Sequence, residues 1–422
     1  MALLRSARIS DGRVVDVRTQ GGRIGEVASA GDLEPEAGEE IHDLTGYLLL
    51  AAPAEPHAHL DKAFTADRVA NPTGDLPGAI DAWLAYRAGL EVHDILERAR
   101  LGATRSLACG ATAIRSHVDV GEGIELRGLD ALIALKEELA ALIPLQLVAL
   151  VSRPLTGLEG ANNRAFLRSA LERGADLVGG APHVDPEPMG ALEFCVRTAA
   201  EFGRPLDLHM DENLDPGSLG LADLARLVAE GFPHSVTASH CVSLGIQPPA
   251  TQVRVAEALA SAGVSVVTLP QTNLYLQGRG WETSPPRALT ALGPLLAAGV
   301  NVAAGGDNVQ DVFNPLGRGD PLEAAGLLVS AGHLSTEQAY CLVSDGARRV
   351  MGLPPVEVAA GLPADLLAVA GASLREVLAS STEDRFVFAA GRLVARTRVE
   401  RHMPANRRDL AVAAGSEALA WP

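Results

Sequence analysis

Lysine is nearly absent from this chain of 422 residues, in which Lys62 and Lys136 are the only lysines among 35 basic residues. Because no lysine follows Lys136, chemistry that requires one is excluded from the rest of the chain. Cysteine is also scarce, and its four occurrences form no CxxC pair: Cys109, Cys195, Cys241 and Cys341. This spacing disfavours both a zinc ribbon and a disulfide framework, and it fits a reducing compartment.

Positive charge is in deficit, and long apolar runs are missing. The net charge of −17 and the pI near 5.1 argue against a nucleic-acid partner, because phosphate backbones are bound mainly by Lys and Arg. No uncharged apolar run reaches the length of about 18 residues that a membrane helix needs. The N-terminal segment also lacks the apolar stretch of a signal peptide. We therefore expect a cytoplasmic protein that binds neither nucleic acid nor membrane.

Both ends of the chain have the pattern of short β-strands. Residues 1–52 alternate brief apolar bursts with Gly and Asp at turn positions, and a similar pattern returns in residues 364–371 and 384–401. A chain of this length is too long for one small core. We predict that residues 1–52 and 355–410 together form a small β-sandwich domain.

The middle of the chain, residues 53–354, alternates short apolar runs with stretches of helical periodicity. We count eight such runs, from residues 48–59 to residues 300–308, separated by helical segments such as 127–142. This repetition predicts an α/β fold, a (β/α)8 TIM barrel. A doubly wound open sheet is the alternative, but no GxGxxG motif opens any of the predicted helices.

Polar side chains lie at the C-terminal ends of the predicted strands, which meet at one face of such a barrel. They are His57, His59, His117, Asp119, Ser152, His183, Asp185, His209, Glu212, His240, Asn273 and Asp307. His57 and His59 are two residues apart and therefore point to the same side of a strand. Neutral imidazoles together with a carboxylate suit Zn, Fe or Mn, so this face is a candidate metal site.

Seven motifs carry a resemblance to a known family. In chain order they are EPHAHLDKAF, IRSHVDV, GGAPHVD, LHMDEN, TASHC, LPQTNLYLQGR and GGDNVQDVFNPLG. Through these motifs the chain resembles the amidohydrolase superfamily and, within it, the cytosine-deaminase-like subgroup of metal-dependent heterocycle deaminases.

The resemblance implies one divalent metal ion, zinc or iron with manganese as an alternative. Its implied ligands are His57, His59, His209 and Asp307. The sequence itself gives independent support for a single metal ion. Superfamily members with two metals usually bridge them with a carboxylated lysine on a middle strand, and no lysine occurs there.

The resemblance also implies catalytic roles for Glu212, His240 and Asp307. A bound divalent ion lowers the pKa of its water towards about 7, which supplies hydroxide near neutral pH. Asp307 would accept the proton of this water, His240 would orient and polarise the water, and Glu212 would protonate a ring nitrogen. The expected reaction replaces an exocyclic amine by a carbonyl and releases ammonia.

Substrate recognition departs from the family pattern at two positions. Ser152 stands where cytosine-selective members carry a glutamine, and Asn308 stands where they carry an aspartate. Lys62 and Gln277 are further expected substrate contacts, because HLDK resembles relatives that act on s-triazines and LYLQGR resembles a ring-contacting or loop-supporting segment. The expected small-molecule substrate is a cytosine-like pyrimidine, then a pterin or purine analogue, then an s-triazine.

Several alternatives stay open. A cyclic amidase or amide hydrolase would open a ring C–N bond instead. An inactive barrel scaffold is disfavoured, because it predicts the loss of a metal ligand or of the proton shuttle, and all six of these residues are present. Four of the residues at strand ends could either line the pocket or form hydrogen-bonded structural pairs: His117, Asp119, His183 and Asp185. Assembly into a homo-oligomer is also left open. The remaining histidines are expected at the surface: His42, His93, His234, His333 and His402.

Overall fold

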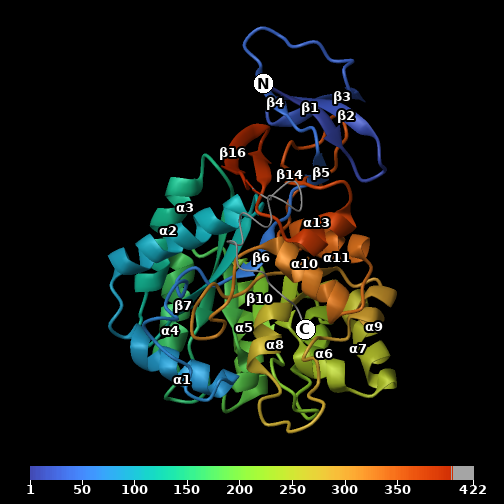
Figure 1. Cartoon of the computed structure of the whole chain (residues 1–422). Coiled ribbons are helices and arrows are strands. Elements are labelled where there is room, and N and C mark those ends of the chain that lie inside the picture. The colour runs from blue at the N-terminus through green and yellow to red at the C-terminus, as the bar shows by residue number, and fades with distance from the viewer. Residues whose placement is uncertain (401, 403–422) are drawn as a thin grey trace, which may run out of the picture.

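The structure is a computed structural model that describes residues 1–400 and residue 402 (Figure 1). One of its two sheets is made of eight parallel strands that follow one another in chain order. These strands are β6 (Glu55–Ala58), β7 (Ile114–Val120), β8 (Leu145–Val151), β9 (Leu177–Gly180), β10 (Leu206–Met210), β11 (Val236–His240), β12 (Val264–Thr268) and β13 (Val302–Ala304). All eight predicted runs contain one of them, which confirms the predicted barrel.

Helices surround this sheet (Figure 1). They are α1 (Leu76–Arg87), α2 (Val92–Ala108), α3 (Arg127–Leu139), α4 (Ala161–Arg173), α5 (Pro188–Phe202), α6 (Gly220–Ala229), α7 (Pro249–Ala262), α8 (Pro270–Leu276), α9 (Leu292–Ala297), α10 (Pro321–Ser330), α11 (Thr336–Val343) and α12 (Asp345–Val350). None of the helices within residues 1–400 combines the length and apolar character that a membrane crossing needs.

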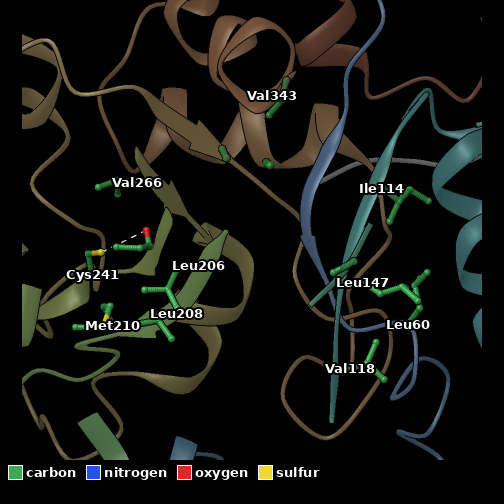
Figure 2. Packing of buried hydrophobic residues seen from close by; sticks show 14 of the residues in the cluster. Leu60, Ile114, Val118, Leu147, Leu206, Leu208, Met210, Cys241, Val266 and Val343 are labelled. Atoms are coloured by element: carbon green, nitrogen blue, oxygen red, sulfur yellow. Dashed lines mark hydrogen bonds between the residues drawn. The ribbon is translucent and has the colours of Figure 1, made fainter. Parts of the chain in front are cut away.

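Alternating side chains on each barrel strand separate the apolar core from the polar interior. On β10, Leu206, Leu208 and Met210 lie in the main apolar cluster beneath the helices (Figure 2). Asp207 and His209, between them, point to the opposite side, into the barrel. Burial of each such apolar side chain contributes about 1.5–3 kcal/mol. The apolar residues therefore fix the register that turns the polar ones inward.

The barrel closes between its first and last strands, β6 and β13. Ala58 forms an isolated parallel bridge with Asp307. The amide of Asp307 donates to the carbonyl of His57 at 3.0 Å, and the amide of His59 donates to the carbonyl of Asp307 at 3.3 Å. Closure thus brings residues from the two ends of the barrel sequence into direct contact.

The second sheet joins both ends of the chain, as predicted. Its eight strands run in the order β16-β15-β14-β5-β1-β2-β3, with β4 paired to β1. They are β1 (Ala2–Arg8), β2 (Val14–Gln20), β3 (Arg23–Ser29), β4 (Glu40–Asp43), β5 (Tyr47–Ala51), β14 (Leu366–Ala370), β15 (Arg385–Ala389) and β16 (Arg392–Thr397), with helix α13 (Leu374–Ser380) between β14 and β15. Parallel pairing of β1 with β4 and β5 makes the sheet mixed.

This sheet packs against the barrel through every second residue. On β14, Leu366 and Ala368 lie in a separate small core, whereas Leu367 and Val369 lie in the main cluster that the barrel helices share. The predicted boundaries at 52/53 and 354/355 remain our proposal, and residues 401 and 403–410 of the predicted domain lie outside the described residues.

Two expectations from the sequence need correction. The apolar run at residues 48–59 is not one strand, because β5 ends at Ala51 and the barrel strand β6 begins at Glu55. His42 is not at the surface: it is 8% exposed on β4, with its ring against Phe386 and Phe388. Its neighbours come from the other end of the chain, which the local sequence does not reveal.

Candidate active site

Barrel closure and strand β10 bring together four predicted metal ligands, which we call the metal centre: His57, His59, His209 and Asp307. The Nε2 atom of His59 lies 3.2 Å from Nε2 of His209 and 3.3 Å from Oδ1 of Asp307. The Nε2 atom of His57 lies 3.8 Å from the same carboxylate oxygen. All four side chains are buried.

The metal centre fits a divalent ion by its donors and its spacing. Tetrahedral zinc with ligands at about 2.1 Å separates neighbouring donor atoms by about 3.4 Å, close to the distances found. Nε2 of His57 and both carboxylate oxygens of Asp307 are buried without any hydrogen-bond partner among the residues that the structure describes, although buried polar atoms nearly always have one. Burial also holds the pKa of His57, His59 and His209 far below its ordinary value, so their imidazoles are neutral and can ligate.

His117, whose role the sequence left open, lies against this centre. Its ring stacks on that of His57 with the centroids 3.9 Å apart, and within residues 1–400 its two ring nitrogens have no hydrogen-bond partner. His57, His117 and His209 form a second group of donors close enough to hold a metal. His117 is therefore a member of the site, which the motif IRSHVDV alone does not establish.

Glu212 and His240 lie beside each other next to the metal centre. Nδ1 of His240 is 3.4 Å from a Glu212 carboxylate oxygen and 3.0 Å from Oδ1 of Asn273. Burial lowers the pKa of His240 to about 4, so its ring is neutral at pH 7. Burial, aided by the charge of Asp307, raises the pKa of Glu212 well above its ordinary value, so this carboxyl holds a proton. A proton donor and a neutral imidazole thus face the same space.

Lys62 and Asp119 form the centre of a buried charge cluster in the pocket wall. Asp119 accepts hydrogen bonds of 2.7 Å from Lys62, from the indole of Trp83 and from Arg87. Burial alone would raise the pKa of Asp119, but Lys62 and Arg87 outweigh it and hold the pKa below its ordinary value. Burial alone would lower the pKa of Lys62, but Asp119 and Asp61 raise it. Both groups are therefore charged.

Sequence reasoning missed Trp83 and Arg87. Both lie on α1, which lines the pocket and is not at a strand end, so the strand-end rule gives no signal for them. Asn273 and Ser239 were also missed as functional residues. The sequence placed Asn273 at the end of a predicted strand, which was a signal for it, but this placement is wrong, because β12 ends at Thr268 and Asn273 lies in α8. Ser239 lies one residue before His240 inside β11.

The expected substrate contacts lie at different depths. Ser152 lines the inner pocket, where its hydroxyl accepts from Arg87 at 2.7 Å and donates to the carbonyl of Val120 at 3.0 Å. Asn308 lines it too, and its amide donates to Asp311. Gln277 lines an outer pocket instead and donates to the backbone carbonyl of Glu212 at 3.0 Å. Gln277 thus supports the loop that carries Glu212.

Two residues from GGAPHVD have separate surroundings. Nδ1 of His183 is 3.1 Å from the carbonyl of His209, and its Nε2 is buried without a partner in the pocket wall. Burial lowers the pKa of His183 to about 4. Asp185 accepts from the amide of Leu155 at 2.7 Å and so fixes the loop that follows β8.

The inner pocket joins these polar groups to an apolar wall. The apolar side chains that line it are Leu76, Ile80, Trp83, Leu84, Leu150, Val151, Leu155, Ala181, Val184 and Phe313. Such a wall suits the faces of a flat ring, while a few polar groups fix the orientation of the ring.

Comparison with known proteins agrees with this geometry. The sequence profile described as "Amidohydrolase family" matches residues 99–395. A pterin deaminase of Rhizobium rhizogenes is 31% identical over 92% of this chain and 87% of its own length. The chain belongs to the amidohydrolase family.

Solved structures of family members have the same fold. The 5-methylcytosine deaminase of Klebsiella pneumoniae, with 5-fluorocytosine bound, has a TM-score of 0.86 and 29% identity, and the match covers 96% of this chain and all (100%) of that one. The N-isopropylammelide isopropylaminohydrolase of Burkholderia multivorans has a TM-score of 0.82 and 30% identity, and the match covers 94% of this chain and 99% of that one. These matches confirm a metal-dependent amidohydrolase that acts on C–N bonds other than peptide bonds.

Proposed function

We propose that this amidohydrolase removes ammonia hydrolytically from an amino-substituted nitrogen heterocycle. The observation that carries the proposal is that His57, His59, His209 and Asp307 converge beside a protonated Glu212 and a neutral His240, with Nε2 of His57 and both carboxylate oxygens of Asp307 lacking a partner among the described residues. His57, His59, His209 and Asp307 would hold one divalent metal ion, zinc or iron. When bound, such an ion activates water as a nucleophile and polarises the carbon that is attacked.

The residues of the chain divide the proton transfers between them. His240, with Nδ1 engaged by Asn273, directs its unpartnered Nε2 to the attacking water and orients it. Asp307 accepts the proton of this water and later gives it to the leaving amine. Glu212 gives its proton to the ring nitrogen beside the reacting carbon, which compensates the charge that develops there.

The pocket wall limits the class of substrate. Lys62 lines the pocket wall with its charge paired to Asp119, and an N–H that Asp119 leaves free favours a ring with a carbonyl oxygen. We propose a cytosine-like pyrimidine as the first candidate, in line with the 5-methylcytosine deaminase, and a pterin or purine analogue as the second. The second is favoured by Leu76, Ile80 and Leu84, since these residues of α1 add apolar wall for a second ring. An s-triazine is the third.

A substrate panel tests this proposal. Metal-loaded protein is incubated with aminopyrimidines, pterins, purines and triazines, and both ammonia and product mass are measured. We expect ammonia from one ring class and a product that has gained a water and lost an ammonia. A product that has only gained water, without ammonia, would instead support the cyclic amidase alternative. Asp307→Asn is the control, because it removes both a charged ligand and the proton acceptor.

A further inference from the structure

A series of buried polar side chains leads through the barrel interior to His57. Arg115 lies on β7, Asp207 on β10 and Ser239 on β11, and all are at most 3% exposed. Nδ1 of His57 is 2.9 Å from the hydroxyl of Ser239, which is 3.0 Å from Oδ1 of Asp207. Oδ2 of Asp207 accepts from Arg115 at 2.7 Å.

The series has a fixed anchor at its far end. The guanidinium of Arg115 also donates to Oε1 of Gln146 at 2.9 Å and to the carbonyl of Val350 at 3.0 Å. Arg115 therefore has little freedom to move. The paired Asp207 is held in turn, because its carboxylate cannot give up the buried cation without a large cost in free energy.

The direction of each hydrogen bond follows from the anchor. An ionised carboxylate only accepts, so Ser239 must donate its single O–H to Asp207. The oxygen of Ser239 is then an acceptor for the N–H at Nδ1 of His57. This leaves the lone pair of His57 at Nε2, the atom that is buried without a partner and faces Asp307.

We propose that Ser239, held by Asp207, is a positioning residue that fixes the tautomer and ring orientation of His57 for metal binding. The inference rests on the metal site of the proposed function. Mutation of a group that is hydrogen-bonded to a metal-ligating histidine typically weakens metal binding about 10- to 100-fold. His117, which lies 3.6 Å from the same oxygen of Asp207, is beyond hydrogen-bonding distance and leaves this oxygen to Ser239.

The test compares two buried hydroxyls on the same strand. Ser239→Ala removes the hydroxyl that accepts the hydrogen bond from His57. Thr237→Val removes a hydroxyl that accepts only a long hydrogen bond, of 3.4 Å, from Arg115. Zinc affinity is measured by competition with a chromophoric chelator, and thermal unfolding of the metal-free proteins is measured beside it. We expect zinc to bind about 10- to 100-fold more weakly to Ser239→Ala. We expect Thr237→Val to retain the affinity of the natural protein.

A third variant keeps the test decisive if Ser239→Ala does not fold. Ser239→Cys preserves most of the volume but replaces oxygen by a weak acceptor, so it should also weaken zinc binding. Unchanged zinc affinity in the folded Ser239 variant, or equal losses in the Ser239 and Thr237 variants, would overturn the inference. Natural protein that binds no zinc would contradict the metal centre itself, and with it the proposed function.

Discussion

Single buried residues control the protonation states on which the proposed chemistry depends. Glu212 and His240 are adjacent, yet burial moves their pKa values in opposite directions, up for the carboxyl and down for the imidazole. Each group is therefore neutral near pH 7. Pairs of titratable groups that differ in this way can divide acid and base roles between them.

The variant Glu212→Gln separates proton transfer from metal binding. The amide keeps the shape of the side chain but has no acidic proton, so kcat should fall about 10²- to 10⁴-fold, the usual contribution of general acid–base catalysis. The metal content should stay at the level of the natural protein. Steady-state kinetics and metal analysis of the same sample check both results. Loss of the metal would instead place Glu212 among the ligands.

At the scale of elements, the site depends on how strands and helices meet. β6 and β13 bring His57, His59 and Asp307 together, while α1 adds Trp83 and Arg87 from outside the barrel. The strand-end residues could be predicted because the barrel geometry places all such positions at one face. The contribution of α1 could not be predicted, since no local pattern in Leu76–Arg87 marks which of its side chains line the pocket.

The charge cluster around Asp119 should contribute strongly to stability. Asp119→Asn leaves Lys62 and Arg87 as buried cations with one partner fewer, so the free energy of unfolding should fall by about 3–5 kcal/mol. Denaturant unfolding of the metal-free protein measures the loss. Glu138→Gln is the matched control, because its pair with Arg100 is exposed, with side chains 42% and 44% accessible. This control should lose no more than about 1 kcal/mol. Equal effects would show that the cluster around Asp119 behaves like a surface pair.

Gly305 permits the close approach of β13 to β6. A Cβ at this position would lie 2.5 Å from Oε1 of Glu55. The Glu55 carboxylate has little freedom to move away, because it accepts hydrogen bonds from the backbone amides of His57 and Gly306. Gly305→Ala should therefore cost about 1–3 kcal/mol of stability and weaken metal retention.

Gly326 in α10 is the control for this substitution. A Cβ there meets nothing within 4 Å, so Gly326→Ala should stabilise the protein by about 0.5–1 kcal/mol. Thermal unfolding measures the stability of both variants, and metal analysis measures how much metal each retains. Normal metal retention in Gly305→Ala would refute the role of this close approach.

At the scale of the whole molecule, the two ends of the chain form one sheet that shares the core of the barrel. Arg385 on β15 makes a buried double ion pair with Asp320, the N-cap of α10, at 2.9 and 2.7 Å. The sequence predicted that both ends join, because the strand pattern occurs at each end. It did not predict this contact or the burial of His42, since neither partner is near in the chain and no local pattern marks the pairing.

The most direct test of the account is a metal titration of activity. Metal-free protein is titrated with zinc, and ammonia release from the best substrate of the panel is measured at each step. The account predicts no release without metal, a linear rise, and a plateau at one zinc per chain. Release from the metal-free protein, or a plateau reached only at two zinc ions per chain, would contradict a single metal at His57, His59, His209 and Asp307.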